Sequence, residues 1–327
     1  QEVGEYVGGF NAFCFEITPY VHAGENLLEV AVSNRRELDI APLEGDFTVF
    51  GGIYRPVSIL LLPKTCITPL DYASSGVYVS QQVSERRADL SVVTKVDNGL
   101  KRVKELSVKA DVFDAAGKLV ATATTSQATE GQARLDFTNR LKVDNPMLWD
   151  GRKSPYLYRV FVELSRGKEV LDTLSQYVGL RSFRVDAEKG FILNGTPYKI
   201  KGVNRHQDRP DKGWTISSAD HREDMSLIKE IGANGIRLAH YPHSDEFYQP
   251  LSLFGGNAVP VRPRGHVGLG RDSFGRQSLG HPGIHGEHEN GIDGTHPAEF
   301  QSPFHFLLEP VERTVQGRGG RIDFGTQ

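Results

Sequence analysis

Apolar and polar residues alternate along much of the first half of the chain. Between residues 64 and 183, apolar side chains or threonine occupy every second position in three runs: Leu90 to Val96, Leu106 to Val112, and Tyr156 to Leu164. Alternation with a period of two turns one face of a strand towards a core. Short strands of this kind, without a helical period, predict an immunoglobulin-like β-sandwich. The cysteine pair of antibody domains is absent from this span, so the pattern predicts only the architecture.

Residues 1–63 contain shorter alternating runs, which glycine, proline and asparagine interrupt. The runs are Phe13 to Ile17 and Leu28 to Val32, and an apolar run from Val57 to Leu62 closes the segment. They predict antiparallel strands with one buried face, but they are too few for a complete sandwich. We therefore expect a partial sandwich whose opening strands are missing, followed by a linker that starts at Pro63.

The pattern changes at about residue 184, where helical and strand signals begin to alternate. Asn194-Gly195 predicts the turn of a hairpin over 191–198, because Asn-Gly is the strongest short hairpin signal. A strand to about residue 204, a helix over 219–231 and a strand over 236–240 follow. Strand, helix and parallel strand form the repeating unit of a (β/α)8 TIM barrel.

The predicted helix has signals at both ends. Ser217 and Asp220 have the spacing of a capping box, and Gly232 suits a left-handed residue after the helix. Its expected apolar stripe consists of Met225, Leu227, Ile228 and Ile231. We therefore expect this stripe to pack against the two strands.

In TIM barrels the reactive side chains project from the carboxyl ends of the strands. The first predicted strand delivers Asn204, Arg205 and His206 to this end, and the second delivers Arg237 and His240. Imidazole and guanidinium groups donate hydrogen bonds, so the two histidines and two arginines are potential donors to sugar hydroxyls. The alternative is structural: the arginines form ion pairs under the barrel, and the histidines cap loops.

Composition and charge give no sign of other kinds of partner. The 327 residues carry a formal net charge of −3 without a basic stripe, so we expect neither nucleic acid nor a membrane as a partner. No apolar run reaches the roughly 18 residues that span a bilayer. Cys14 and Cys66 lie in strand-like runs and predict two buried thiols, with a disulfide as the alternative.

Several motifs resemble glycoside hydrolase family 2, and in particular its β-galactosidases. Gly202–His206 and Arg237–Pro242 are similar to motifs at the start of the family's TIM barrel. Gly8–Phe13 and Gly51–Pro56 resemble its sugar-binding jelly roll, and Asn145–Trp149 resembles its immunoglobulin-like domain. The resemblance implies three domains in the family's order: a partial jelly-roll domain over residues 1–63, an immunoglobulin-like β-sandwich over 64–183, and the start of the catalytic TIM barrel over 184–249.

The resemblance also implies substrate contacts. His206 and His240 match histidines that contact the galactose ring, and Asn204 belongs to the same motif as His206. Arg237 matches the arginine beneath the catalytic nucleophile. Asp46 matches an aspartate that reaches the site from the jelly roll, and its alternative is an ordinary turn residue.

The catalytic residues of the family are missing from the pattern. The family cleaves glycosides with two glutamates, an acid/base and a nucleophile, and in a retaining enzyme they lie about 5–5.5 Å apart. The acid/base belongs to an Asn-Glu pair, and no such pair occurs in this chain. None of the glutamates after residue 249 lies in a strand pattern, so none is expected to be catalytic: Glu287, Glu289, Glu299, Glu309 and Glu312. We therefore expect an inactive fragment of a retaining β-galactosidase.

Other functions are compatible with the same residues. The Gln207-Asp208 continuation favours a β-galactosidase over a β-glucuronidase, and a β-mannosidase is a further alternative. A non-catalytic carbohydrate-binding or structural remnant is the alternative outside the enzymes. No cofactor is expected in this chain, whereas the resemblance implies a divalent or sodium ion in intact family enzymes. The resemblance leaves the compartment open between bacterial periplasm and cytoplasm, and leaves the oligomeric state open too.

Residues 250–327 differ from the rest of the chain. They contain no lysine, almost half of the 35 glycines and more than half of the 11 histidines, without a sustained period. In a shifted reading frame their second half allows a helix followed by a strand that contains Asn-His-Pro-Ser and ends in Asn-Glu. We therefore interpret the segment as an out-of-frame tail and expect it to be irregular. His281, His285 and His288 have a spacing that suits a metal on a helix, but the proline and glycines between them argue against a helix, so no metal site is expected.

Overall fold

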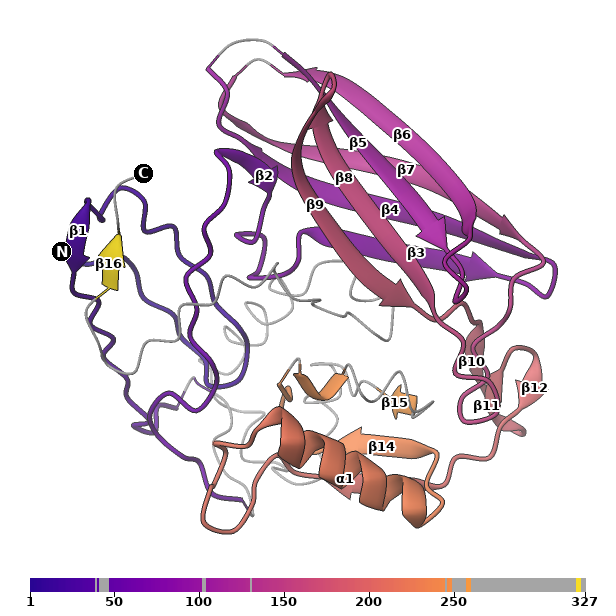
Figure 1. Cartoon of the computed structure of the whole chain (residues 1–327). Coiled ribbons are helices and arrows are strands. Elements are labelled where there is room, and N and C mark those ends of the chain that lie inside the picture. Colours follow the sequence, from indigo (N-terminus) through magenta and orange to yellow (C-terminus); the bar gives the residue numbers. More distant parts are fainter. Residues whose placement is uncertain are drawn as a thin grey trace.

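A computed structural model describes residues 1–38, 40, 47–101, 104–129, 131–244 and 246–248, together with the backbone of two short strands, Asn257–Val259 and Ile322–Phe324. These residues form an extended amino-terminal segment, a β-sandwich, and a small parallel sheet with one helix (Figure 1). The architecture is mainly β and then α/β, as the sequence predicts. Within the described ranges no helix is long and apolar enough to cross a bilayer.

One layer of the sandwich is built around the long strand β4 (Arg87–Asn98). Along one edge it pairs antiparallel with β7 (Ala133–Asp144) over the whole length of both strands. Along the other edge it pairs first with β3 (Val77–Val83) and then with β2 (Thr65–Ile67). The side chains of β4 alternate between buried and half-buried, which confirms the predicted alternation from residue 90 to residue 96.

The second layer has the order β6, β5, β8, β9, and all its pairs are antiparallel. Its strands are β5 (Lys104–Phe113), β6 (Leu119–Thr129), β8 (Tyr158–Arg166) and β9 (Glu169–Val178). Both layers contribute to one core, whose fully buried members include Val92, Val96, Leu106, Val108, Phe137, Val160, Val162 and Leu164. Complete burial of an aliphatic or aromatic side chain contributes roughly 1.5–3 kcal/mol, so this shared core is the main stabilising feature of the sandwich.

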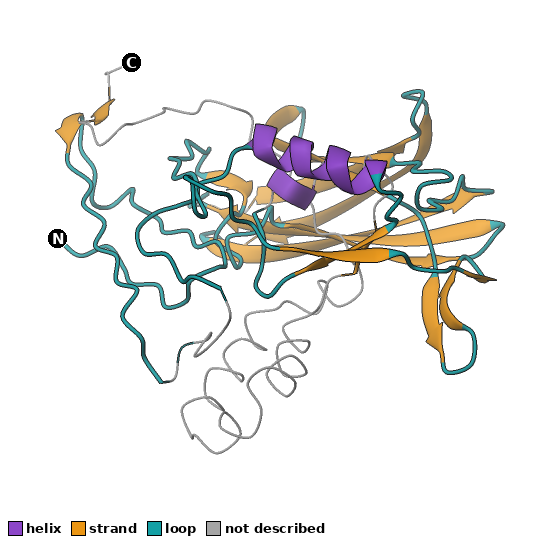
Figure 2. Ribbon diagram, turned by 90° about the horizontal axis from the view of Figure 1, so that it is seen from below, coloured by secondary structure: helices purple, strands orange, loops and turns teal. Residues whose placement is uncertain are grey.

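The amino-terminal segment differs from the prediction. Nearly all of it is drawn as loop in Figure 2, and its described strand is β1 (Gly24–Asn26), which pairs antiparallel with β16 (Ile322–Phe324). The alternating runs predicted as strands are extended but form no ladder in the described residues, and Phe13 and Val30 are 55% and 47% exposed. A strand needs a neighbour to pair its backbone groups, and alternation in sequence alone does not supply one.

The hairpin predicted around Asn194-Gly195 is present. β11 (Gly190–Leu193) pairs with β10 (Phe183–Asp186) on one side and with β12 (Thr196–Pro197) on the other. Asn194 and Gly195 have φ values of 49° and 80°. Both residues of a type I′ turn require a positive φ, which asparagine and glycine tolerate best.

The predicted barrel unit follows, with β13 (Gly202–Arg205), α1 (Ser218–Glu230) and β14 (Gly235–Leu238). Ser217 and Asp220 form the predicted capping box, and Gly232 has the predicted left-handed conformation, with φ at 82°. The two strands pair in parallel, as a barrel requires. This part of the chain therefore folds as the sequence predicts.

The predicted apolar stripe of α1 is partly wrong. Met225 is 3% exposed and Ile228 packs against the same cluster, but Leu227 and Ile231 are 54% and 69% exposed. His221, which the stripe omitted, is fully buried. Positions 221, 225 and 228 follow the i, i+4, i+7 spacing of one helix face, whereas 227 and 231 lie on another face.

Three residues of the segment after residue 249 join the barrel sheet. β15 (Asn257–Val259) pairs in parallel with β14, with Asn257 opposite Gly235, and so adds a third strand to the barrel sheet. With β16, the structure thus describes two short strands where the sequence predicted none. The other residues of the tail, including the histidines considered for a metal site, lie outside the described residues.

Candidate functional site

The carboxyl ends of β13 and β14 bring two histidines together. The strands are parallel, with Arg205 opposite Leu238, so the residues that follow them meet at one edge of the sheet. There the imidazole rings of His206 and His240 have centroids 5.1 Å apart and planes inclined at 74°. Both residues are half-buried. The strand pattern in the sequence predicted this convergence.

Arg237 and Asn204 are directly opposite each other on these strands. Side chains in such a pair point to the same face of the sheet. Nη2 of Arg237 lies 3.1 Å from Nδ1 of His240. Arginine has no acceptor, so this Nδ1 accepts, and the proton of the neutral ring lies on Nε2. The structure therefore brings Arg237 and Asn204 to the histidines, whereas Asp46 lies outside the described residues.

Phe47, the residue after Asp46, contacts both histidines from the amino-terminal segment. Its ring centroid lies 5.6 Å from that of His206 and 5.8 Å from that of His240. Tyr241 packs against the same ring at 5.3 Å, and its hydroxyl lies 3.4 Å from Nδ1 of His206. Burial raises the pKa of Tyr241 to about 12, so the hydroxyl remains protonated. An apolar ring thus covers one side of the histidine pair.

A cluster of aromatic rings docks the amino-terminal segment onto the barrel residues. Trp214 is 3% exposed, and its ring lies 5.3 Å from Phe10, 5.3 Å from Phe50 and 5.0 Å from Tyr54. Phe10 also stacks on Tyr241, with centroids 4.6 Å apart and planes within 6°. This cluster fixes the part of the segment that carries Phe47.

Arg55 adds polar contacts to the same junction. Its Nη2 donates to the carbonyl of Pro242 at 2.7 Å and to Oε1 of Gln207 at 3.3 Å, and its Nη1 donates to the carbonyl of Phe10. Oε1 of Gln207 also accepts from the backbone N–H of Ser244 at 3.2 Å. Gln207 is only 1% exposed, so its amide serves the packing of the junction. The sequence singled out none of these three contacts of Arg55.

Arg205 is in the interior and not at the open edge of the site. It is 6% exposed, and its Nε donates to Oδ2 of Asp224 on α1 at 3.0 Å. For Arg205 the structure therefore shows the structural alternative, in which the arginine forms an ion pair. Arg237, by contrast, contacts a histidine that faces the site.

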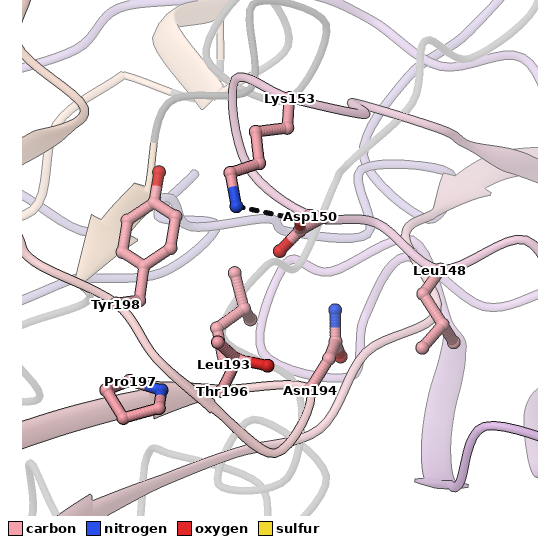
Figure 3. A pocket seen from close by; sticks show the side chains of 8 residues that line it. All are labelled: Leu148, Asp150, Lys153, Leu193, Asn194, Thr196, Pro197 and Tyr198. Atoms are coloured by element: carbon pink, nitrogen blue, oxygen red, sulfur yellow. Dashed lines mark ion pairs between the residues drawn. The ribbon is translucent and has the colours of Figure 1, made fainter.

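One hollow among the described residues lies away from the histidines, between the sandwich and the hairpin (Figure 3). It has a volume of about 250 Å³, and Asp150, Lys153, Asn194 and Tyr198 contribute its polar groups. Asp150 and Lys153 pair with each other at 3.9 Å, and the amide of Asn194 donates to the carbonyl of Trp149 at 3.0 Å. These polar groups already have partners, so we assign the hollow to a joint between domains.

Metal ligation has no support in the part of the chain that the structure describes. No group of three or more histidine, cysteine, aspartate or glutamate side chains there is arranged to hold a metal ion. The described site is therefore a set of hydrogen-bond donors bordered by aromatic rings. Such a combination suits the hydroxyl groups and the apolar face of a sugar.

Comparison with protein families gives two matches in succession. The model described as "Glycosyl hydrolases family 2" matches residues 74–181, which cover the sandwich except for β2. The model described as "Glycosyl hydrolases family 2, TIM barrel domain" matches residues 183–255 and so includes β13, α1 and β14. The chain belongs to glycoside hydrolase family 2. The second match extends six residues beyond the boundary at 249 that the sequence predicts.

Several relatives match over about three quarters of the chain. The chain is 38% identical over 258 residues to a β-glucuronidase of Bacteroides fragilis, covering 78% of this chain and 37% of that protein. It is 33% identical over 251 residues to a β-galactosidase of Thermoanaerobacter pseudethanolicus, covering 75% of this chain and 32% of that protein. The chain thus spans about a third of the length of these relatives.

Solved structures show the same similarity. A β-glucuronidase of Bacteroides uniformis matches with a TM-score of 0.77 and 31% identity, over 93% of this chain and 35% of that one. A structure described as a putative β-galactosidase of Bacteroides fragilis matches with a TM-score of 0.68 and 30% identity. The match covers 83% of this chain and 44% of that one. The names of the relatives therefore include two different substrates.

Proposed function

We propose that this chain supplies the sugar-facing part of a retaining family 2 glycosidase site, in which His206 and His240 contact the hydroxyl groups of a terminal β-linked sugar. The observation that carries the proposal is the convergence of the two rings, 5.1 Å apart, at the carboxyl ends of adjacent parallel strands. That edge is where TIM barrels carry out their chemistry. Arg237 fixes His240 with its proton on Nε2, which makes this nitrogen a hydrogen-bond donor.

Two further residues complete the proposed set of sugar contacts. Asn204 shares its face of the sheet with Arg237, and its amide can both donate to and accept from a hydroxyl. Asp46 is proposed as a contact from the amino-terminal segment. The support for Asp46 is its neighbour in the chain, because Phe47 lies against both His206 and His240.

We propose that this chain binds the sugar without cleaving it. Retaining hydrolysis needs an acid/base and a nucleophile about 5–5.5 Å apart, and the family's Asn-Glu pair is missing from the sequence. Hydrogen-bond donors alone orient a substrate but do not protonate a leaving group or form a glycosyl intermediate.

The proposed substrate is a terminal β-galactoside, because Gln207-Asp208 resembles the β-galactosidases of the family. A β-glucuronide is the second candidate: one observation favours it, and another weakens the argument for a β-galactoside. Several similar proteins are named β-glucuronidases. In addition, Gln207 is buried and hydrogen-bonded to Arg55, so its side chain does not contact the sugar directly.

Two measurements test the proposal. Saturation-transfer NMR with galactose and with glucuronate should show transfer to galactose, and the transfer should be lost in His240→Ala but retained in the control His22→Ala, whose side chain is exposed. Transfer to glucuronate instead would select the second candidate, and transfer to neither would contradict sugar binding. Release of nitrophenol from 4-nitrophenyl β-galactoside and β-glucuronide should stay at background. Turnover that co-purifies with the chain would contradict the proposed absence of catalysis.

A further inference from the structure

A buried guanidinium group lies directly behind the loop that carries His240. Arg205, the last residue of β13, donates to the carboxylate of Asp224 through Nε at 3.0 Å and through Nη2 at 2.5 Å. Its Cζ lies 4.0 Å from the centre of the ring of Phe247. The carboxylate holds one edge of the guanidinium group and the ring covers one face, so its plane is fixed.

Two buried histidines complete the surroundings of Arg205. Its Nη1 donates to Nδ1 of His243 at 3.1 Å, and its Nη2 donates to Nδ1 of His221 at 3.0 Å. Each ring accepts on Nδ1 and therefore carries its proton on Nε2. Nε2 of His243 donates to the carbonyl of Ala239 at 3.3 Å. Nε2 of His221 donates to the hydroxyl of Ser244, also at 3.3 Å.

These two hydrogen bonds are made to residues on either side of His240 in the sequence. The carbonyl of Ala239 belongs to the peptide bond that precedes His240, and Ser244 lies four residues after it. The backbone N–H of Ala239 also donates to the carbonyl of Arg205 at 2.9 Å. The segment 239–244 is thus tied at both ends to a network centred on Arg205.

The network is compatible with its buried position because both imidazoles are neutral. Burial and then the charge of Arg205 lower the pKa of His221 to about 4 and that of His243 to about 3. Asp224 balances the charge of Arg205 and also pairs with Arg209 at 2.5 Å. The further charged groups that act on the two imidazoles are Asp220, Glu246 and Arg55.

We propose that Arg205 is a positioning residue of the site: through His243 and His221 it sets the backbone on either side of His240 and holds that ring opposite His206. Arg205 itself is too buried to touch a sugar. This inference rests on the proposed role of His240 as a sugar contact. Lysine cannot replace Arg205, because an ammonium group does not offer donors in one plane to a carboxylate and two imidazoles.

The test uses the full chain with nitrogen-labelled histidine, and long-range proton–nitrogen NMR spectra report the tautomer and the surroundings of each ring. In the wild type we expect His221, His240 and His243 as Nε2–H tautomers. In Arg205→Met the signals of His243 and His240 should shift and broaden, and Arg205→Lys should fail to restore them. The matched control is Arg209→Met, which removes another ion pair of Asp224 but contacts neither imidazole, and which should leave the signal of His240 in place.

A second variant keeps the test decisive if Arg205→Met does not fold. His243→Gln removes the link from Arg205 to the carbonyl of Ala239, together with the ring contacts of His243 to Tyr241 and Phe247, but it leaves Arg205 in place. It should still displace the signal of His240. An unchanged His240 signal in folded Arg205→Met or in His243→Gln would overturn the inference. The spectra require no sugar, so absence of sugar binding by the wild type would contradict the proposed function separately.

Discussion

Phe47 lies over the imidazole of His240, with ring centroids 5.8 Å apart and planes inclined by 29°. Phe47 belongs to the amino-terminal segment, and His240 follows a strand of the barrel sheet. The site therefore joins two segments that are distant in the sequence, and the aromatic cluster around Trp214 holds them together.

We expect Phe47→Ala to weaken galactose binding several-fold, because it removes the ring that covers His206 and His240. Aromatic contacts contribute about 0.5–1.5 kcal/mol beyond buried area, which corresponds to roughly a two- to tenfold change in affinity. Saturation-transfer NMR at increasing galactose concentration measures the change. The control is Phe13→Ala, an exposed ring of the same segment, which should bind like the wild type. Equal weakening in both variants would contradict a role of Phe47 in the site.

Acidification should destabilise the barrel part of the chain. The pKa of His243 falls to about 3 and that of His221 to about 4 in the folded chain, from an ordinary value of 6.5. Between these values the unfolded chain binds more protons, so the free energy of unfolding decreases as the pH falls. The contribution of the two neutral imidazoles to the free energy of unfolding is fully present above pH 6.5 and is lost towards pH 3–4. The loss is at most about 1.4 kcal/mol per pH unit for each imidazole.

Urea unfolding followed by tryptophan fluorescence at a series of pH values measures this dependence. His243→Gln should flatten the profile between pH 6.5 and 4, because it removes one of the two imidazoles that must take up a proton. His22→Gln, at an exposed position, should leave the profile unchanged. An equally steep profile in His243→Gln would contradict the assignment of the dependence to this residue.

The sandwich should be the most protease-resistant part of the chain. It has its own core and two layers of paired strands, whereas many large apolar side chains are exposed among the described residues of 1–62. Limited proteolysis should leave a fragment of roughly 110–130 residues centred on the sandwich, which is within the usual size of a domain. Mass spectrometry identifies the fragment. A most resistant core that maps to residues 1–62 or 250–327 would contradict this domain division.

Within the sandwich, Phe137→Ala should lower the free energy of unfolding by about 3–5 kcal/mol, because the ring is fully buried in the shared core and its removal leaves a cavity. Leu119→Ala is the control at a position that is 46% exposed, and it should have a small effect. Urea unfolding of the chain measures both. A cost below about 1 kcal/mol for Phe137→Ala would show that this residue is not part of a close-packed core.

The features that the sequence predicts correctly depend on local chemistry. Asn194-Gly195 defines a turn, Ser217 and Asp220 define a helix start, and the parallel arrangement of two strands brings His206 and His240 to one edge. The apolar stripe of α1 was partly wrong because Leu227 was assigned to the buried face, although it lies on another face of the helix.

The contacts that the sequence did not predict are distant along the chain. Arg55 reaches Pro242 across 187 positions, and Phe47 and Phe10 contact barrel residues from the amino-terminal segment. No period or spacing encodes such pairs, since they depend on how domains pack. For the same reason the sequence assigned Gln207 to substrate choice, whereas the structure shows it buried beneath Arg55.

The most direct test of the proposed site is to map bound galactose onto the histidine rings. Galactose added to the chain with nitrogen-labelled histidine should shift the ring signals of His206 and His240 in a saturable manner. The signal of His22 should stay unchanged, because its ring is exposed and bonds to the neighbouring carbonyl of Ala23. Absence of a shift at both His206 and His240, in a sample where saturation transfer shows that galactose is bound, would contradict the account, because the sugar would then occupy another surface of the chain.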